Sequence, residues 1–149
     1  MSRFLGPPLT DDEREIVFAT SRGMLGTPYK HKGRRLNGTD CIGFLFLLFS
    51  TVRAVPKTRL DYGRTPHNGK LRAGLIDYLG QPVAGPMRHG DVVTMRWTGD
   101  AHHVGLIVPH PQREFGLIHA DNTAAGGPRV VEHGIDKFWR RRILEWWRP

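Results

Sequence analysis

Polar and apolar positions divide the chain into a helical first half and a strand-rich second half. Residues 10–25 begin with a threonine followed three residues later by Glu13, a capping-box pattern, and acidic residues gather at this positive helix end. Residues 41–52 are nearly all apolar, a run too long for an ordinary strand that favours a buried helix. Residues 69–80 place leucine and isoleucine on one helical face between two glycines. We therefore expect a helix over each of these segments.

After Gly80 the pattern changes to short β-prone runs separated by turn residues. The runs are GDVVTMRW at 90–97, HHVGLIV at 102–108, FGLIHA at 115–120 and PRVVEH at 128–133. Such runs are typical of an antiparallel meander. Helices followed by strands predict an α+β fold, with N-terminal helices packed on a small antiparallel β-sheet.

Two segments have a less regular pattern. Residues 27–40 are interrupted by proline and glycine and predict a loop that leads to Asp40, which is suited to cap the helix beginning at Cys41. The basic and aromatic run 137–149 favours a closing strand with Ile143 facing the core. Cations mixed with aromatic residues are also found where proteins bind single-stranded nucleic acid.

Composition limits the possible protein classes. With 149 residues and 39% hydrophobic residues, the chain is expected to form a single domain over residues 1–149. Its one cysteine excludes an intramolecular disulfide. The sequence contains no signal-peptide pattern and no run of ~18 apolar residues, so synthesis in the cytoplasm and no membrane partner are expected. A net charge of +8 favours polyanionic partners, either nucleic acid or an acidic cell wall.

Cys41 is the first candidate for chemistry. A buried cysteine is commonly a small core residue, and that interpretation stays open. However, a thiol in the first turn of a helix lies among amide donors at the positive end of the dipole, which predicts a lowered pKa and a nucleophile. A thiol nucleophile needs an imidazole base and a polar group that orients the base.

The strand region supplies two imidazoles. His103 and His119 lie in runs predicted to be neighbouring strands, so they can meet across the sheet. Since side chains alternate along a strand, only one of His102 and His103 can face Cys41. The other histidines fall in predicted loops or at element ends, where solvated rings are expected: His31, His67, His89, His110 and His133.

The segments GTPYKHKGRRLNGTDCIGFL, GDVVTMRW, HHVGLIV and LIHA occur in an order and spacing that resembles the NlpC-type peptidoglycan cysteine peptidases, a papain-like family. The resemblance covers roughly residues 11–145. It implies that Cys41 is the nucleophile, His103 the general base and His119 the residue that orients the base. It also implies that Tyr29 stands beside the thiol. Asp121 and Asn122 remain alternatives to His119.

Two roles around the nucleophile rest on general chemistry. The backbone N–H of Cys41, at a helix start, is a candidate oxyanion donor. Asp40 either caps the helix or contacts substrate. The sequence departs from the family pattern at Ile42, where the family usually has a serine. The resemblance implies that this serine faces the substrate. This departure puts in doubt which peptide end is held, and therefore which bond is cut.

The implied reaction is hydrolysis of the stem-peptide amide between D-γ-glutamyl and a diamino acid, through an acyl-enzyme and without a cofactor or metal. The short chain resembles the phage-tail and gene-transfer-agent members of the family, which implies tail or baseplate partners and action on the cell wall. Three alternatives stay open: a related amidase or acyltransferase, a zinc site formed by Cys41, His103 and His119, and an inactive basic tail-structural or nucleic-acid-binding protein. Nucleic acid is the less favoured partner.

Overall fold

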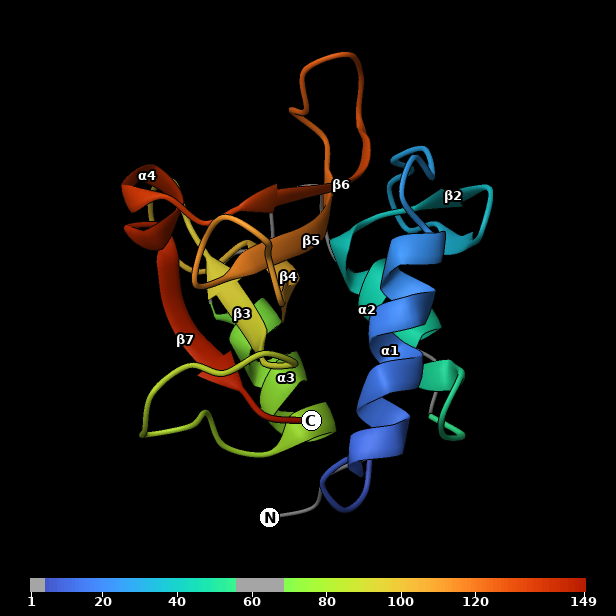
Figure 1. Ribbon diagram of the computed structural model, residues 1–149, viewed down its shortest axis with the longest axis vertical. Coiled ribbons are helices and arrows are strands. Elements are labelled where there is room, and N and C mark those ends of the chain that lie inside the picture. The colour runs from blue at the N-terminus through green and yellow to red at the C-terminus, as the bar shows by residue number, and fades with distance from the viewer. Residues whose placement is uncertain (1–4, 56–68) are drawn as a thin grey trace.

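The three longer helices pack on one side of a curved antiparallel sheet, and a short fourth helix lies apart from them (Figure 1). The computed structural model describes residues 5–55 and 69–149. The helices are α1 (Asp11–Gly23), α2 (Cys41–Ser50), α3 (Lys70–Leu79) and α4 (Lys137–Arg140). The strands are β1 (Arg34–Arg35), β2 (Gly38–Thr39), β3 (Val92–Met95), β4 (His103–Val108), β5 (Gly116–Asp121), β6 (Arg129–Gly134) and β7 (Ile143–Trp147).

The main sheet has the strand order β6-β5-β4-β3-β7, and every neighbouring pair is antiparallel. The meander and the closing strand predicted from the sequence are therefore confirmed. β7 returns beside β3, so the C-terminal segment completes the sheet. Ile143 is buried as expected, whereas the arginines just before it lie in α4 and the turn that follows it, outside the strand.

The strands bury side chains on both faces of the sheet, which explains why their sequences are nearly continuous apolar runs. Val104 and Leu106 of β4 belong to the main core with the apolar residues of α1 and α2. Ile107 of β4 and Leu117 of β5 belong to a second cluster on the other face. α2 packs directly against β4 and β5, so the start of this helix is held against the centre of the sheet.

The structure adds two short elements to the predicted ones. The segment 27–40, predicted to be a loop, contains the two-stranded pair β1 and β2. Strands of two residues are too short for side-chain alternation to be visible in a sequence. The run 137–149, predicted to be a strand throughout, begins with one turn of helix, α4, whose N-cap Asp136 accepts a hydrogen bond from the Trp139 backbone N–H.

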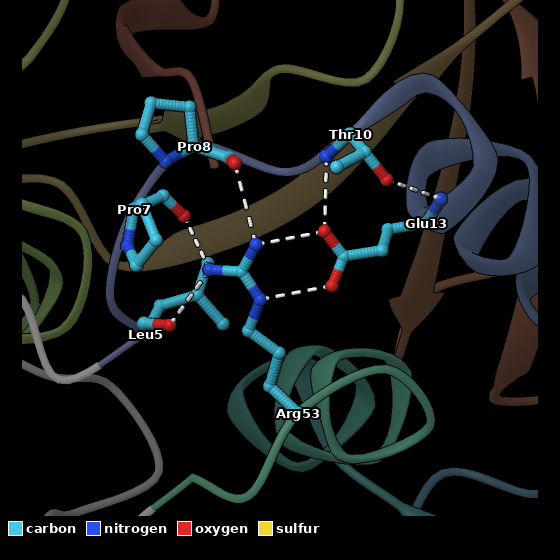
Figure 2. Close-up of polar contacts among 6 residues, drawn as sticks. All are labelled: Leu5, Pro7, Pro8, Thr10, Glu13 and Arg53. Atoms are coloured by element: carbon cyan, nitrogen blue, oxygen red, sulfur yellow. Dashed lines mark hydrogen bonds and ion pairs between the residues drawn. The ribbon is translucent and has the colours of Figure 1, made fainter.

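Arg53 joins the N-terminal segment to the start of α1 (Figure 2). Its guanidinium donates to both carboxylate oxygens of Glu13, at 2.9 and 2.7 Å, and to the backbone carbonyls of Leu5, Pro7 and Pro8. Glu13 also completes the predicted capping box with Thr10. The Arg53 hydrogen bonds, followed by that from the Thr10 backbone, lower the pKa of Glu13 to about 2.

We expect Arg53→Met to lower the thermal unfolding midpoint at pH 7 by a few degrees and to weaken its pH dependence. The lowered pKa of Glu13 stabilises the fold above pH 4.5, and this stabilisation is lost as the pH falls towards 2. The control is Arg72→Met, which breaks the more exposed ion pair with Glu145. Calorimetry between pH 2 and 7 should show a flatter curve only for Arg53→Met, and parallel curves for both variants would contradict this prediction.

Candidate active site

The first turn of α2 is fixed by Asp40. Its Oδ1 accepts hydrogen bonds from the Gly43 backbone N–H at 2.8 Å and from Arg34 Nη1 at 3.1 Å. Its Oδ2 accepts a hydrogen bond from the Lys32 backbone N–H at 2.8 Å. Asp40 is only 1% exposed. Because both oxygens are engaged and buried, the structure favours the capping role for Asp40 over substrate contact.

The loop before α2 lies directly on the helix start at Gly43. A Cβ atom at this position would lie 2.0 Å from the Gly33 carbonyl oxygen and 2.6 Å from Thr39 Oγ1. Real Cβ atoms do not approach backbone so closely, so only glycine fits. The glycine two residues after the cysteine therefore allows the loop to hold the helix terminus.

Cys41 lies at this terminus, buried among the main-core residues. The backbone N–H groups of Val104, Ile42 and Cys41 itself interact with the sulfur. Val104 follows His103, so the thiol lies against the beginning of β4. Burial, and after it the Asp40 carboxylate, raise the pKa of Cys41 to about 12. The predicted lowering of this pKa is wrong, because the backbone donors at the helix start do not offset desolvation in this buried position.

The structure brings His103 and His119 together. His103 Nε2 and His119 Nδ1 are 2.7 Å apart, which is hydrogen-bond distance. His119 is fully buried, whereas His103 is half-buried. Burial lowers the pKa of His103 to about 4 and also lowers that of His119. Both rings are therefore neutral near pH 7.

The alternatives to His119 occupy other positions. Asp121 Oδ1 accepts hydrogen bonds from the backbone N–H and the hydroxyl of Thr123, at 2.9 and 2.8 Å. The negative charge of Asp121 still raises the pKa of His103 in part. Asn122 is exposed. The residue hydrogen-bonded to His103 is His119.

Two further predicted site residues flank the helix terminus. The backbone N–H of Tyr29 donates to the Pro128 carbonyl at 3.0 Å, and Tyr29 packs against the core cluster that contains Cys41. Ile42, which replaces the serine of the family pattern, also packs against this cluster. The apolar side chain at position 42 therefore contributes to the core.

His133 also contacts the candidate site, which the sequence did not predict. Its Nε2 lies 2.9 Å from His119 Nε2, so its expected position as a solvated ring is wrong. The strand prediction ended at His133, whereas β6 continues to Gly134. In the register of the sheet, His133 lies opposite Leu117, two residues from His119 on the neighbouring strand. Diagonal neighbours at this spacing are within reach of aromatic rings.

Two tryptophans surround the three histidines. The Trp139 ring lies 5.2 Å from the His119 ring and 4.5 Å from the His133 ring, measured between centroids. Trp97 lies 5.9 Å from His103 and 5.7 Å from Trp139, and is 37% exposed. Trp139 therefore packs against His119 and His133, and the partly exposed Trp97 lies beside His103.

The contacts among these rings engage both nitrogens of His119 and one nitrogen each of His103 and His133. In the described parts of the chain, no three His, Cys, Asp or Glu side chains are arranged as a metal-ligand group. The zinc alternative with Cys41, His103 and His119 therefore has no support from the geometry.

Within residues 5–55 and 69–149, no helix has the length and hydropathy needed to cross a membrane.

The raised pKa of Cys41 and the lowered pKa of His103 predict that the Cys41 thiol and the His103 imidazole are both neutral near pH 7. We expect alkylation of Cys41 by iodoacetamide to be slow at pH 7 and to accelerate up to about pH 12, as the thiolate fraction grows. The rate is measured by intact-mass spectrometry between pH 5 and 10. A thiolate paired with an imidazolium would instead give a rate that is independent of pH over this range, which would contradict the prediction.

Comparisons with known proteins identify the same family that the motifs resemble. The NlpC/P60 family pattern matches residues 26–148. An NlpC/P60 family protein from Bacillus cereus ATCC 10987 is similar in structure, with TM-score 0.62 and 18% identity, over 96% of this chain and 42% of that chain. The chain therefore spans less than half of that protein's structure. No curated protein matches the sequence.

Two further solved structures share the fold. The NlpC/p60 domain of the peptidoglycan hydrolase SagA matches with TM-score 0.54 and 18% identity, over 90% of this chain and 97% of that domain. NlpC2 from Trichomonas vaginalis matches with TM-score 0.63 and 15% identity, over 99% of this chain and 51% of that chain. These matches confirm the predicted α+β fold of the NlpC type.

Proposed function

Since the chain belongs to the NlpC/P60 family of cysteine peptidoglycan hydrolases, we propose that it hydrolyses peptidoglycan stem peptides with Cys41, His103 and His119. The observation that carries this proposal is the 2.7 Å contact between His103 Nε2 and His119 Nδ1. His103 immediately precedes Val104, whose backbone N–H interacts with the Cys41 sulfur. We also propose that residues 1–149 act as one peptidase domain.

The proton leaves the thiol during attack, because both groups are neutral at rest. His103 Nε2 faces His119, so Nδ1 is the nitrogen that accepts the Cys41 proton. The proposal requires the half-buried His103 ring to approach the thiol when substrate binds. The Sγ–C bond forms, and the amide oxygen becomes an oxyanion near the Cys41 backbone N–H, which already lies close to the sulfur.

The tetrahedral intermediate then collapses to the acyl-enzyme, and the same groups take part in this step and in the hydrolysis that follows. The amide C–N bond breaks, and protonated His103 gives its proton to the leaving amine. Water next attacks the thioester, loses a proton to His103 and releases the acyl group as a carboxylic acid. The thiol of Cys41 is restored when it takes that proton back.

We propose the amide between D-γ-glutamyl and the diamino acid as the bond that is cut. The proposal further places the enzyme in a phage tail or prophage particle, in contact with tail or baseplate proteins and acting on the cell wall. The net charge of +8 supports binding to an anionic wall. Tyr29, packed against the cluster around Cys41, is the side chain we propose to stand beside the thiol.

Product analysis tests the reaction and the bond together. The protein is incubated with soluble stem-peptide fragments in water enriched in oxygen-18, and the products are identified by mass spectrometry. We expect a free D-γ-glutamyl carboxylate carrying one heavy oxygen and a diamino acid with a free amine. A product joined to an added amine would indicate an acyltransferase, and cleavage at another amide would contradict the proposed bond.

A further inference from the structure

The three histidines form a continuous row of hydrogen bonds that ends on a backbone carbonyl. His103 contacts His119 at 2.7 Å, and His119 contacts His133 at 2.9 Å. The far nitrogen of His133, Nδ1, lies 3.0 Å from the Gly134 carbonyl oxygen. We call these three residues the histidine row.

The Gly134 carbonyl determines which nitrogen is the donor in each hydrogen bond of the histidine row. A carbonyl oxygen only accepts hydrogen bonds, so His133 Nδ1 must carry a proton. With one proton on each ring, His133 Nε2 is an acceptor and takes a hydrogen bond from His119 Nε2–H. His119 Nδ1 is then an acceptor as well and takes one from His103 Nε2–H. The proton on His103 is thereby placed on Nε2, and Nδ1 is left unprotonated.

We propose that His133 is a positioning residue that, together with the Gly134 carbonyl, fixes the tautomer in which His103 Nδ1 is free to act as the base. This inference rests on the proposed peptidase function and extends it by one residue beyond the three named there. His133 acts through His119 and does not touch the reacting atoms.

Because His119 is buried, the donor and acceptor assignment of the histidine row affects which tautomers are stable. His119 is fully buried, so an unpaired N–H on this ring has no water to bind and is unfavourable. Trp139 packs on both His119 and His133 and keeps the connecting hydrogen bond within an aromatic environment. Without the His133 acceptor, the tautomer that suits His103 as a base loses its preference.

Two substitutions separate positioning from simple packing. His133→Leu removes the acceptor, and we expect kcat to fall roughly tenfold to a hundredfold with KM nearly unchanged. His133→Gln keeps an oxygen acceptor at this position and is expected to recover most of kcat. The matched control is His89→Leu, because His89 is an exposed histidine that also binds a backbone carbonyl, that of Glu114. Equal kcat losses for His133→Leu and His133→Gln would overturn the proposal.

A spectroscopic measurement tests the same proposal without substrate. Long-range proton to nitrogen-15 spectra of the ring-labelled full-length protein report which nitrogen of each imidazole carries the proton. We expect protons on Nε2 of His103, Nε2 of His119 and Nδ1 of His133, and a mixed His119 tautomer in His133→Leu. A proton on Nδ1 of His103 in the parent protein would overturn the proposal. Because this result does not depend on cleavage, its failure is distinguishable from failure of the proposed reaction.

Discussion

Cys41→Ala is expected to lower the rate of stem-peptide cleavage at least about a thousandfold, because an alanine side chain cannot form the acyl-enzyme. The residual rate comes from groups that still bind and polarise the amide. The Asp40 cap and the backbone N–H groups around position 41 remain in place, so substrate affinity should change little. Cleavage is measured by the release of the amine product under single-turnover conditions.

The control for this prediction is a test that Cys41→Ala is still folded. The Cys41 sulfur is buried in the main core, so its removal leaves a small cavity and lowers the unfolding free energy by about 1 kcal/mol. Unchanged circular dichroism and a thermal midpoint within several degrees of the parent would show that the variant is folded. A folded Cys41→Ala protein that cleaves at the parent rate would show that the Cys41 thiol has only a structural role.

Gly43→Ala is expected to have the largest effect on stability, at least about 3 kcal/mol of unfolding free energy. The added Cβ would lie 2.0 Å from the Gly33 carbonyl oxygen, and backbone cannot move aside as a flexible side chain can. The loop would have to lift from the helix terminus. Its movement would also disturb the Asp40 contacts with Lys32 and Arg34.

Gly74→Ala is the matched control, since it makes the same chemical change within a helix. Nothing lies within 4 Å of a Cβ at Gly74 in α3, so this variant should be more stable than the parent by about 0.5–1 kcal/mol. Both variants are compared by urea unfolding. Similar stability of Gly43→Ala and the parent would show that the loop does not hold the start of α2 as described.

The sequence predicts the helices and the main strands because each has a strong local signal. The capping box at Thr10, the apolar run after Asp40 and the glycines around α3 each mark an element boundary. β1 and β2 carry no such signal, because a pair of two-residue strands is determined by tertiary contacts. The α4 turn is likewise short, and its aromatic residues also suit a strand.

The site was predictable in part. Adjacent strands predict that His103 lies near His119, which the structure confirms, and motif order predicts the cysteine that we propose as the nucleophile. The role of His133 depends on the register between β5 and β6, which local patterns do not specify. The pKa of Cys41 depends on the balance between burial and helix-terminus donors, and this balance requires the packed structure.

The most direct test of the account is acid quenching of the parent protein mixed with stem peptide, followed by intact-mass spectrometry and peptide mapping. We predict a transient adduct with the mass of the acyl half of the peptide, located on the peptide that contains Cys41 and absent from Cys41→Ala. Steady cleavage with no adduct at any time, and undiminished in Cys41-alkylated protein, would contradict a cysteine acyl-enzyme at this site.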